Sequence, residues 1–324
     1  MRTIHLLAAV LVASALPAQA QTAAPFPERD KKLSIVVPFA AGGGVDAAAR
    51  LLGDQLRKQL GMTVIVENKP GASGTIGGNA VRTAPADGYT LLFSAATHVM
   101  TKYVLSASSY DPQTDFEPVA RTGTAPLMLV AATSRPQARL QDIVAAVRQE
   151  PGRWTAGIPA AGAPSHLATL KLAQQAQLKF NVIPYKGTQP ALMDVAGGHT
   201  DLQLDSMIAL QQMAKAGKVR GVAVTSAKRS SLAPEIPTFK ESGLPDFVFE
   251  SWYGVWAPKG TPPERVAALN TAINAATAEL ARSGQLAILG FEPVTESPAQ
   301  FKSYIAAEVK EGADLLKNAG FRPE

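Results

Sequence analysis

The stretch LSIVVPFAAGGGVDAAARLL, residues 33–52, places three consecutive glycines between a β-rich apolar run and a run with apolar residues at helical spacing. This pattern predicts a strand, a glycine-rich turn and a helix. A turn of this kind leaves the first N–H groups of the helix unpaired and exposes the positive end of the helix dipole. It is therefore suited to hold an anion, a carboxylate included.

The same alternation continues along the chain. Strand patterns at 63–68 and 89–95, with a short helix near 76–82 between them, complete a βαβαβ unit, and residues 126–224 alternate strand and helix again. Two long helical patterns, 262–284 and 297–320, close the chain. The order predicts an α/β fold with mostly parallel sheets flanked by helices.

The organisation also predicts two lobes. The closing helices need a sheet to cover, so we expect the chain to enter a second lobe near 116–130 and to return near 247–257. The predicted division assigns 27–125 and 252–324 to a discontinuous lobe 1 and 126–251 to lobe 2. Two crossing strands would then form the hinge of a cleft that closes around a ligand.

The N-terminus predicts export. Arg2 precedes an apolar run from Leu6 to Leu16, and Ala18-Gln19-Ala20 matches a signal peptidase site, so residues 1–20 form a predicted signal peptide cleaved after Ala20. The run is too short for a permanent membrane span, which needs about 20 residues. We therefore expect a soluble periplasmic protein.

Composition limits the chemistry further. The chain has no cysteine among its 324 residues, which excludes thiol catalysis, thiolate metal sites and disulfides. Without residues 1–20 it keeps 30 basic and 26 acidic residues, a formal charge of +4. The basic residues are scattered, so the sequence predicts no nucleic-acid partner.

The glycine turn also satisfies a dinucleotide-binding pattern. Gly42, Gly44 and Ala47 match GxGxxA, and Glu67 ends the next strand about 20 residues on, where a ribose-binding acid would lie. An exported NAD(P)-type oxidoreductase is therefore the alternative function. Against it stand a turn longer than the tight dinucleotide turn and export to a compartment where dinucleotides are scarce.

Four further loops after predicted strands repeat the chemistry of the first. They are 71–75, 94–97, 162–165 and 185–188. Open α/β sheets bind ligands at the carboxyl ends of their strands, so five such loops divided between two lobes predict a clamp for a small carboxylate. Glycines at such turns are often turn formers only, and for a single loop both interpretations stay open.

Other polar patterns are weaker. Ser165 and His166 are adjacent in sequence, whereas a hydrolase needs a spatially opposed pair and an orienting acid. His98, His166 and His199 lack metal-ligand spacing, so we expect structural or surface roles and no metal site. Asp46 is expected to cap its helix and to pair with Arg50 four residues on.

For four residues the sequence allows either a packing role or a ligand contact. Trp252, Tyr253 and Trp256 are expected in the core or hinge, with cleft lining as the alternative. Asp205 ends a strand that faces the predicted cleft. There it would accept a hydrogen bond from a ligand ammonium or hydroxyl, or else cap the helix that follows.

Six segments in order resemble the Bug family, the extracytoplasmic receptors of tripartite tricarboxylate transporters. They are PFAAGGGVDAAAR (38–50), VIVENKPGASGTIGGNAV (64–81), PADGYTLLFSA (85–95), PSHLA (164–168), PYKGTQPALMDVAGGHTDL (184–202) and PEIPTFKESGLPDF (234–247). The resemblance implies a two-lobed fold of the periplasmic binding protein type II kind, without catalysis or a cofactor. It further implies a monomer that captures a small organic acid, such as a di- or tricarboxylate, an acidic amino acid or an aromatic acid, for membrane permease subunits.

The resemblance also implies which residues contact the ligand. In lobe 1 these are Phe39, Ala40, Ala41, Gly42, Gly43, Ala72, Ser73, Gly74, Thr75, Ser94 and Thr97. In lobe 2 they are Ala161, Gly162, Ala163, Ser165, His166, Tyr185, Lys186, Gly187 and Asp205. The chain departs from the family pattern where Gly44-Val45 replaces a proline and a hydroxyl residue, and where Ala161 and Ala163 replace Ser or Thr. Both departures would suit a less polar distal end of the ligand.

Overall fold

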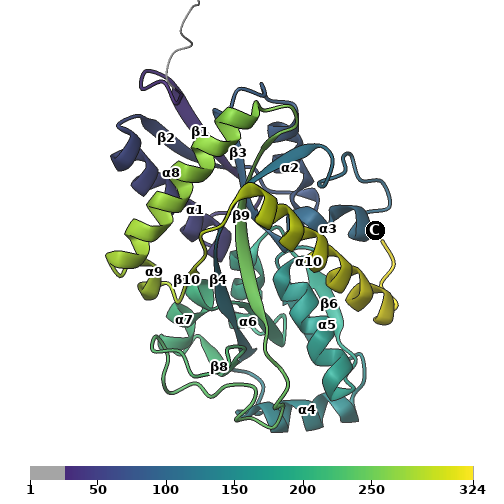
Figure 1. Ribbon diagram of the computed structural model, residues 1–324. Helices are drawn as coiled ribbons and strands as arrows, with labels where there is room; N and C mark the ends of the chain where they lie inside the picture. The colour runs from purple at the N-terminus through teal and green to yellow at the C-terminus, as the bar shows by residue number, and fades with distance from the viewer. Residues whose placement is uncertain (1–25, 324) are drawn as a thin grey trace, which may run out of the picture.

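The computed structural model describes residues 26–323, so the predicted signal peptide and its cleavage site lie outside the described residues. The chain starts with β1 (Lys32–Val37), α1 (Gly44–Leu60), β2 (Thr63–Asn68), the 3-10 turn η1 (Ala72–Gly74), α2 (Thr75–Arg82), β3 (Thr90–Ala95) and α3 (Ala96–Val104). The predicted βαβαβ unit is thereby confirmed, with one helix more after β3 (Figure 1).

The second half of the chain also alternates. It contains β4 (Phe116–Ala132), α4 (Leu140–Gln149), β5 (Thr155–Ile158), α5 (Pro164–Ala176), β6 (Asn181–Pro184), α6 (Thr188–Ala196), β7 (Leu202–Ser206), α7 (Met207–Lys215) and β8 (Val219–Val224). The chain then returns through β9 (Glu250–Pro258) to α8 (Pro263–Arg282), α9 (Gln285–Ile288), β10 (Glu292–Pro293) and α10 (Pro298–Asn318).

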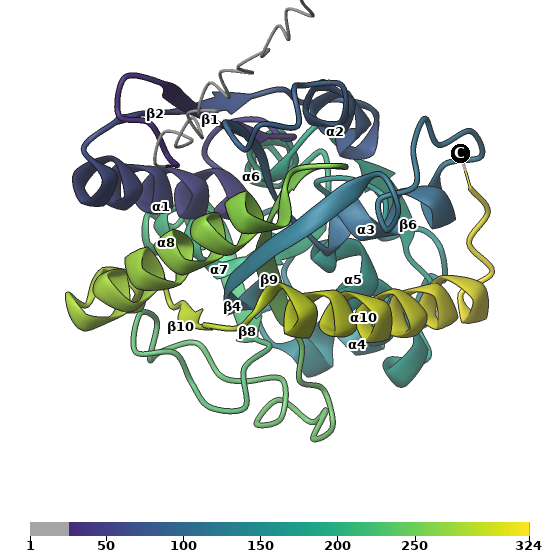
Figure 2. The same cartoon turned by 45° about the horizontal axis from the view of Figure 1, so that its top comes forward.

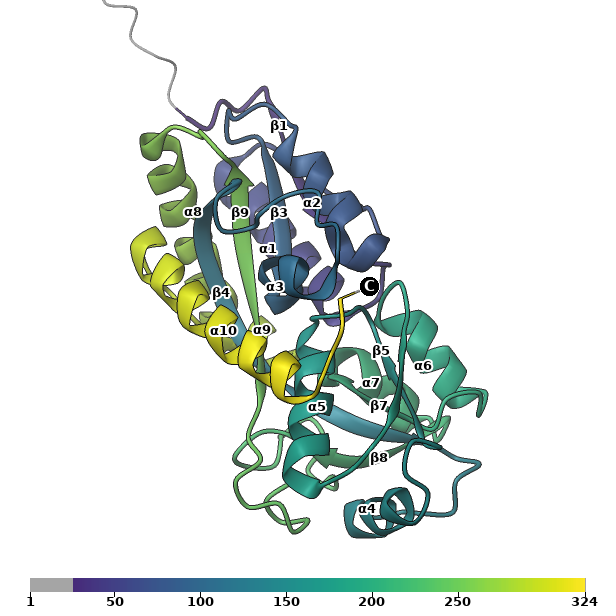
Figure 3. The same cartoon turned by 90° about the vertical axis from the view of Figure 1, so that its right-hand side faces the viewer.

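The strands follow the order β2-β1-β3-β9-β4-β7-β5-β6, with β10 and β8 also paired to β4. The first part of β4 pairs with β9, and its last part pairs with β7 and β8. One long strand is thus shared by the sheets of two lobes, which lie one beyond the other in Figure 3. The change of partners beside Pro126 supports the predicted lobe border, whose position remains our proposal.

The sheets are mixed: the described strands form four parallel and five antiparallel pairs, and β4 or β9 takes part in every antiparallel pair. β1 runs parallel to β2 and β3, and β5 runs parallel to β6 and β7, whereas β4 and β9 pair antiparallel with each other. The antiparallel pair is a consequence of connectivity, because β4 carries the chain out of lobe 1 and β9 carries it back. β4 also shifts register against β9 at two places, 118–120 and 121–123. Such bulges bend a strand locally.

The closing helices cover opposite faces of the β4–β9 region. Leu269 and Ile273 of α8 belong to a buried cluster with Val255, and Phe301 and Ile305 of α10 belong to another, which also contains Trp252 and Trp256. Figure 2 shows α8 and α10 flanking β4 and β9. Both tryptophans are buried, so the packing interpretation of these two side chains is confirmed.

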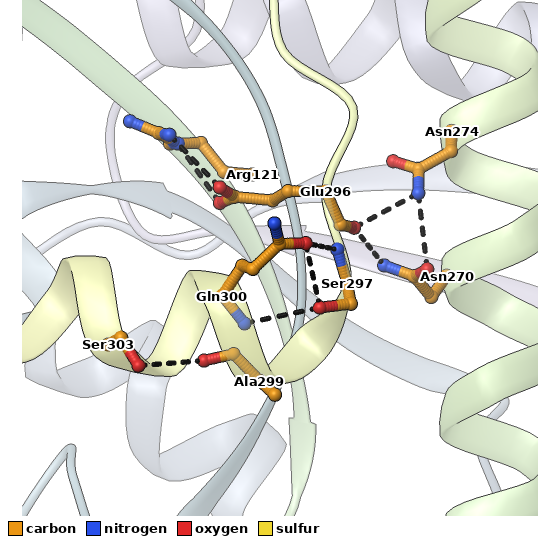
Figure 4. A network of polar contacts seen from close by, with 8 residues as sticks. All are labelled: Arg121, Asn270, Asn274, Glu296, Ser297, Ala299, Gln300 and Ser303. Carbon is orange, nitrogen blue, oxygen red and sulfur yellow. Dashed lines mark hydrogen bonds and ion pairs between the residues drawn. The ribbon is translucent and has the colours of Figure 1, made fainter.

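A polar network holds the segment before α10 against β4 and α8 (Figure 4). Arg121 donates to both carboxylate oxygens of Glu296, each at 3.0 Å. Asn270 and Asn274 donate to the main-chain oxygen of Glu296 at 2.9 and 3.0 Å. Ser297 then opens α10 with a capping box. The network therefore anchors α10 to the strand that joins the lobes.

Candidate ligand-binding cleft

A hollow of about 450 Å³, its opening to solvent included, lies between the lobes at the carboxyl ends of β1, β3, β5 and β7. Lobe 1 contributes Phe39, Ala40, Gly43, Gly44, Val45, Asp46, Ala95, Thr97 and Tyr253, and Ser251 lies at the predicted lobe border. Lobe 2 contributes Pro159, Ala163, Pro164, Thr188, Asp205 and Ser206.

The N-terminus of α1 forms one wall of this hollow. Gly43 is the N-cap residue, and no side chain caps the helix there. Gly44 and Val45 follow in the first helical turn and line the hollow with it. The N–H groups of a first turn have no partner within the helix, and they carry the positive end of its dipole. This wall is therefore suited to a carboxylate.

Asp46 occupies the same turn but is engaged within lobe 1. Its carboxylate accepts from the Gly42 N–H at 2.9 Å and from Asn68 Nδ2 at 2.9 Å, and it pairs with Arg50 at 2.9 Å. Burial alone would raise the pKa of Asp46, but these hydrogen bonds, that from Arg50 first, lower it. The expected pairing with Arg50 is confirmed, whereas the expected cap is wrong, because Gly43 is the N-cap residue and no side chain caps α1. The Gly42 N–H is occupied by Asp46.

The two lobes touch at the mouth of the cleft. The Ala40 N–H donates to the Lys186 carbonyl at 3.2 Å, and Gln189 Nε2 donates to the Gly42 carbonyl at 2.8 Å. A Cβ added to Gly187 would lie 3.1 Å from the Ala40 Cβ. The predicted turns of the two lobes therefore face each other in a closed arrangement.

Asp205 is the buried acid of lobe 2 in this hollow. It accepts from the Ser206 N–H at 2.7 Å, from Gln203 Nε2 at 3.1 Å and from the Thr188 side chain. The described residues that line the hollow include no lysine, arginine or histidine. Burial therefore raises the pKa of Asp205 to about 6. A hydrogen-bond donor on a ligand would relieve the cost of this unpaired charge.

Part of the predicted contact set lines the hollow, and part of it does not. Phe39, Ala40, Gly43, Thr97, Ala163 and Asp205 are in the lining. Gly42, Lys186 and Gly187 lie in the contact between the lobes, and Ala41 is exposed in the same turn. Ser94 and Ala161 are buried outside the lining.

The loop 72–75 lies behind the lining. A Cβ added to Gly74 would lie 3.4 Å from the Phe39 ring, and the Thr75 hydroxyl donates to the Ala72 carbonyl at 2.8 Å. Ala72 and Ser73 have φ values of 46° and 49°, in the left-handed region that favours glycine. Such strain costs on the order of 1–3 kcal/mol per residue and is typical of functional loops. A ligand contact here remains our proposal.

Two polar groups of the loop 161–166 are hydrogen-bonded within the protein. The Gly162 N–H donates to His166 Nδ1 at 3.1 Å, and the Ser165 hydroxyl donates to the Leu204 carbonyl at 2.5 Å. A Cβ added to Gly162 would lie 2.8 Å from the Met100 Cβ. This loop therefore packs against α3 of lobe 1, and its contact with a ligand remains a prediction.

Tyr185 points away from the hollow. Its hydroxyl donates to Asp194 Oδ2 at 2.6 Å and lies 2.8 Å from Thr200 Oγ1. Both partners belong to lobe 2. The structure thus supports a structural role for its side chain, and a ligand contact of Tyr185 is left as a prediction.

The histidines serve packing. Burial lowers the pKa of His98 to about 3 and that of His166 to about 4, so both are neutral at physiological pH. The His98 ring packs edge-on against Phe116 and Trp256. Within residues 26–323, no group of three or more potential metal ligands is present. The expectation of structural histidines therefore holds for His98 and His166.

Several lining residues were missed in the sequence. Thr188 belongs to the predicted loop 185–188 but was left out of the predicted contacts, and Ser206 directly follows Asp205, so extending each contact segment by one residue would have included them. Ser251 gave no such signal, because it reaches the cleft from a strand that is far away in sequence. Tyr253 was expected in the core or hinge, with cleft lining as the alternative, and it both packs there and lines the cleft.

The comparisons with known proteins agree with this geometry. Residues 48–321 match the family described as tripartite tricarboxylate transporter family receptor. Protein BugT of Bordetella pertussis is 34% identical over 313 residues, which cover 96% of this chain and 95% of that protein. None of the described helices is long and apolar enough to cross a membrane.

Solved structures are similar over most of the chain. The periplasmic binding protein BugD is 35% identical with a TM-score of 0.83, covering 90% of this chain and 99% of that one. R. palustris Rpa4515 with adipate is 34% identical with a TM-score of 0.86, covering 92% and 100%. MatC from Rhodopseudomonas palustris with bound malate is 30% identical with a TM-score of 0.80, covering 90% and 100%.

These likenesses run through both lobes and support a receptor rather than an oxidoreductase, so the dinucleotide interpretation of Gly42, Gly44 and Ala47 was wrong. The resemblance to the Bug family is confirmed. With its two contacting lobes and the hollow between them, the chain belongs to the tripartite tricarboxylate transporter receptor family, a family of periplasmic solute-binding proteins.

Proposed function

We propose that this receptor captures a small organic carboxylate between its lobes and delivers it to the permease subunits of a tripartite tricarboxylate-type transporter. The observation that carries this proposal is the uncapped N-terminus of α1, which lines a hollow whose described lining has no basic side chain. A carboxylate there would be bound by main-chain N–H groups and the helix dipole. The adipate and malate complexes of similar proteins support the same class.

The other end of the ligand would meet lobe 2. Phe39, Val45 and Pro159 give the hollow apolar walls, and Asp205 adds an acceptor. The ligand would therefore carry one carboxylate toward α1 and an ammonium or hydroxyl toward Asp205, within the predicted range of di- or tricarboxylates, acidic amino acids and aromatic acids. Thr188 and Ser206 join the predicted contacts in this proposal.

The remaining expectations belong to the same proposal. The receptor would be exported with cleavage after Ala20 and would act in the periplasm as a monomer, without a nucleic-acid partner. The mature chain, residues 21–324, is therefore the form to test.

A thermal-shift screen tests the proposal. Malate, succinate, adipate, glutamate and benzoate would be added to the mature chain, with NAD as the control for the dinucleotide alternative. An acid present at 100 times its dissociation constant is expected to stabilise the protein by about 2.7 kcal/mol. Stabilisation by NAD alone, or by none of the acids, would contradict carboxylate capture.

A further inference from the structure

Gly44 is held closely by residues of both lobes. A Cβ added to it would lie 2.2 Å from Ser206 Oγ, 2.7 Å from Ser206 Cβ and 2.9 Å from the Tyr253 hydroxyl oxygen. All three distances are well below ordinary van der Waals contact. Gly44 lies inside α1 and has no positive φ, so the need for glycine here is one of space rather than of backbone conformation.

The neighbours of Gly44 cannot easily move aside. Rotating the Ser206 side chain would not relieve the contact, because its Cβ itself would be 2.7 Å away. The Tyr253 ring is buried and packs against Phe291 at 4.6 Å and against Phe93 at 6.4 Å between ring centroids. A methyl group at position 44 would therefore push against the Ser206 Cβ, which can move only with its backbone, and so against lobe 2.

The contact extends along the whole glycine turn. A Cβ added to Gly43 would lie 3.1 Å from Thr188 Oγ1, and one added to Gly42 would lie 3.0 Å from Gln189 Cγ. Each of the three glycines thus faces a residue of lobe 2. Gly44 has the tightest of these contacts, and Ser206, which it meets, is 4% exposed and lines the ligand hollow.

We propose that Gly44 sets how far the two lobes close, and thereby the length of the ligand that the closed cleft accepts. Restoring ordinary contact with a methyl group at position 44 would move Ser206 back by about 1 Å. The lobes would then close less far and leave a longer cleft. The closure limit is a property of the protein itself, whereas the effect on ligand length rests on the proposed function.

An engineered disulfide measures closure without a ligand. The Cβ of Thr188 lies 3.4 Å from the Cβ position of Gly43, close to the spacing of a disulfide, and the chain has no other cysteine. In a Gly43→Cys/Thr188→Cys background, the rate of disulfide formation is expected to fall at least about tenfold with Gly44→Ala, equivalent to about 1.4 kcal/mol of closure.

A second substitution and a control separate closure from general damage. Gly44→Ala/Ser206→Gly is expected to restore the rate to within about threefold, because Ser206→Gly removes the two clashing atoms of lobe 2 and leaves only the contact with the Tyr253 hydroxyl of lobe 1. Gly53→Ala, in the same helix, would contact Val66 of lobe 1 and is expected to leave the rate unchanged. An unchanged rate with Gly44→Ala, or no disulfide in the cysteine background itself, would overturn the proposal.

The ligand arm compares succinate with adipate by calorimetry. Gly44→Ala is expected to weaken succinate binding about tenfold more than adipate binding, and Ser206→Gly to reverse the change. If Gly44→Ala lowers the affinity for both acids by the same factor, the link between closure and ligand length is overturned. If neither these acids nor malate and glutamate, which carry the hydroxyl or ammonium expected toward Asp205, bind the wild-type receptor, the proposed carboxylate function is contradicted, while the disulfide rates still decide the closure limit.

Discussion

Replacing Arg121 by alanine is expected to lower the free energy of unfolding by about 3–5 kcal/mol, because it leaves the Glu296 carboxylate buried without its partner. The side chains of Arg121 and Glu296 are 15% and 10% exposed, and two hydrogen bonds of 3.0 Å join them. The Arg121 guanidinium also lies 3.6 Å from the centre of the Tyr304 ring of α10. Its loss would loosen α10 from the strand that joins the lobes.

Urea unfolding at pH 7 measures this change. Arg139→Ala is the matched control, because Arg139 and Asp142 form the same two hydrogen bonds of 3.0 Å at the surface, with 74% and 38% exposure. Solvent screens an exposed pair, so its loss should change the free energy of unfolding far less. Equal losses for Arg121→Ala and Arg139→Ala would show that burial of the first pair has no energetic consequence.

Replacing Asp205 by asparagine is expected to stabilise the ligand-free protein at pH 8 relative to the wild type. Burial raises the pKa of Asp205 to about 6 from 3.8. The folded state therefore binds a proton at Asp205 more tightly than the unfolded state does. The stability that this proton adds is fully present below pH 3.8 and is lost as the pH rises through about 6. An asparagine side chain carries no charge at any pH, so the advantage of the variant should be about 2 kcal/mol larger at pH 8 than at pH 4.5.

Asp201 provides a control of opposite sign in the same lobe. Burial alone would raise the pKa of Asp201, but hydrogen bonds from Arg135 and Thr155 lower it. Asp201→Asn should therefore destabilise the protein by a nearly constant amount from pH 8 down to pH 5, with a loss that shrinks only as the pH falls below 3.8. A pH-independent effect of Asp205→Asn would mean that the Asp205 carboxyl does not titrate abnormally in the cleft.

The glycine turn shows that a local sequence pattern can predict the correct secondary structure but only part of the role of the segment. Residues 33–52 predicted a strand, a turn and a helix, which the structure has as β1 and α1. They also predicted an anion-binding helix N-terminus, and this N-terminus lines the interlobe hollow. What the pattern could not indicate is that Gly42 to Gly44 also pack against lobe 2, because those partners follow more than 140 residues later.

The lobe 2 predictions show a similar limit. Asp205 and Ala163 line the hollow, whereas the side chains of Ser165, His166 and Tyr185 form hydrogen bonds with other groups of the protein. Their residue types suit a ligand and a packed interior equally well. Only the direction of each side chain separates the two roles, and that direction depends on neighbours remote in sequence.

The sequence by itself determined the α/β class, the order of strands and helices, and the receptor family. Strand and helix periodicities are local, and the family motifs extend along most of the chain. The tertiary structure decided which groups meet in the cleft, namely Gly44 with Ser206 and Tyr253, and Asp205 without a basic partner. These contacts join segments from two lobes, so their distances follow from how β4 and β9 set one lobe against the other.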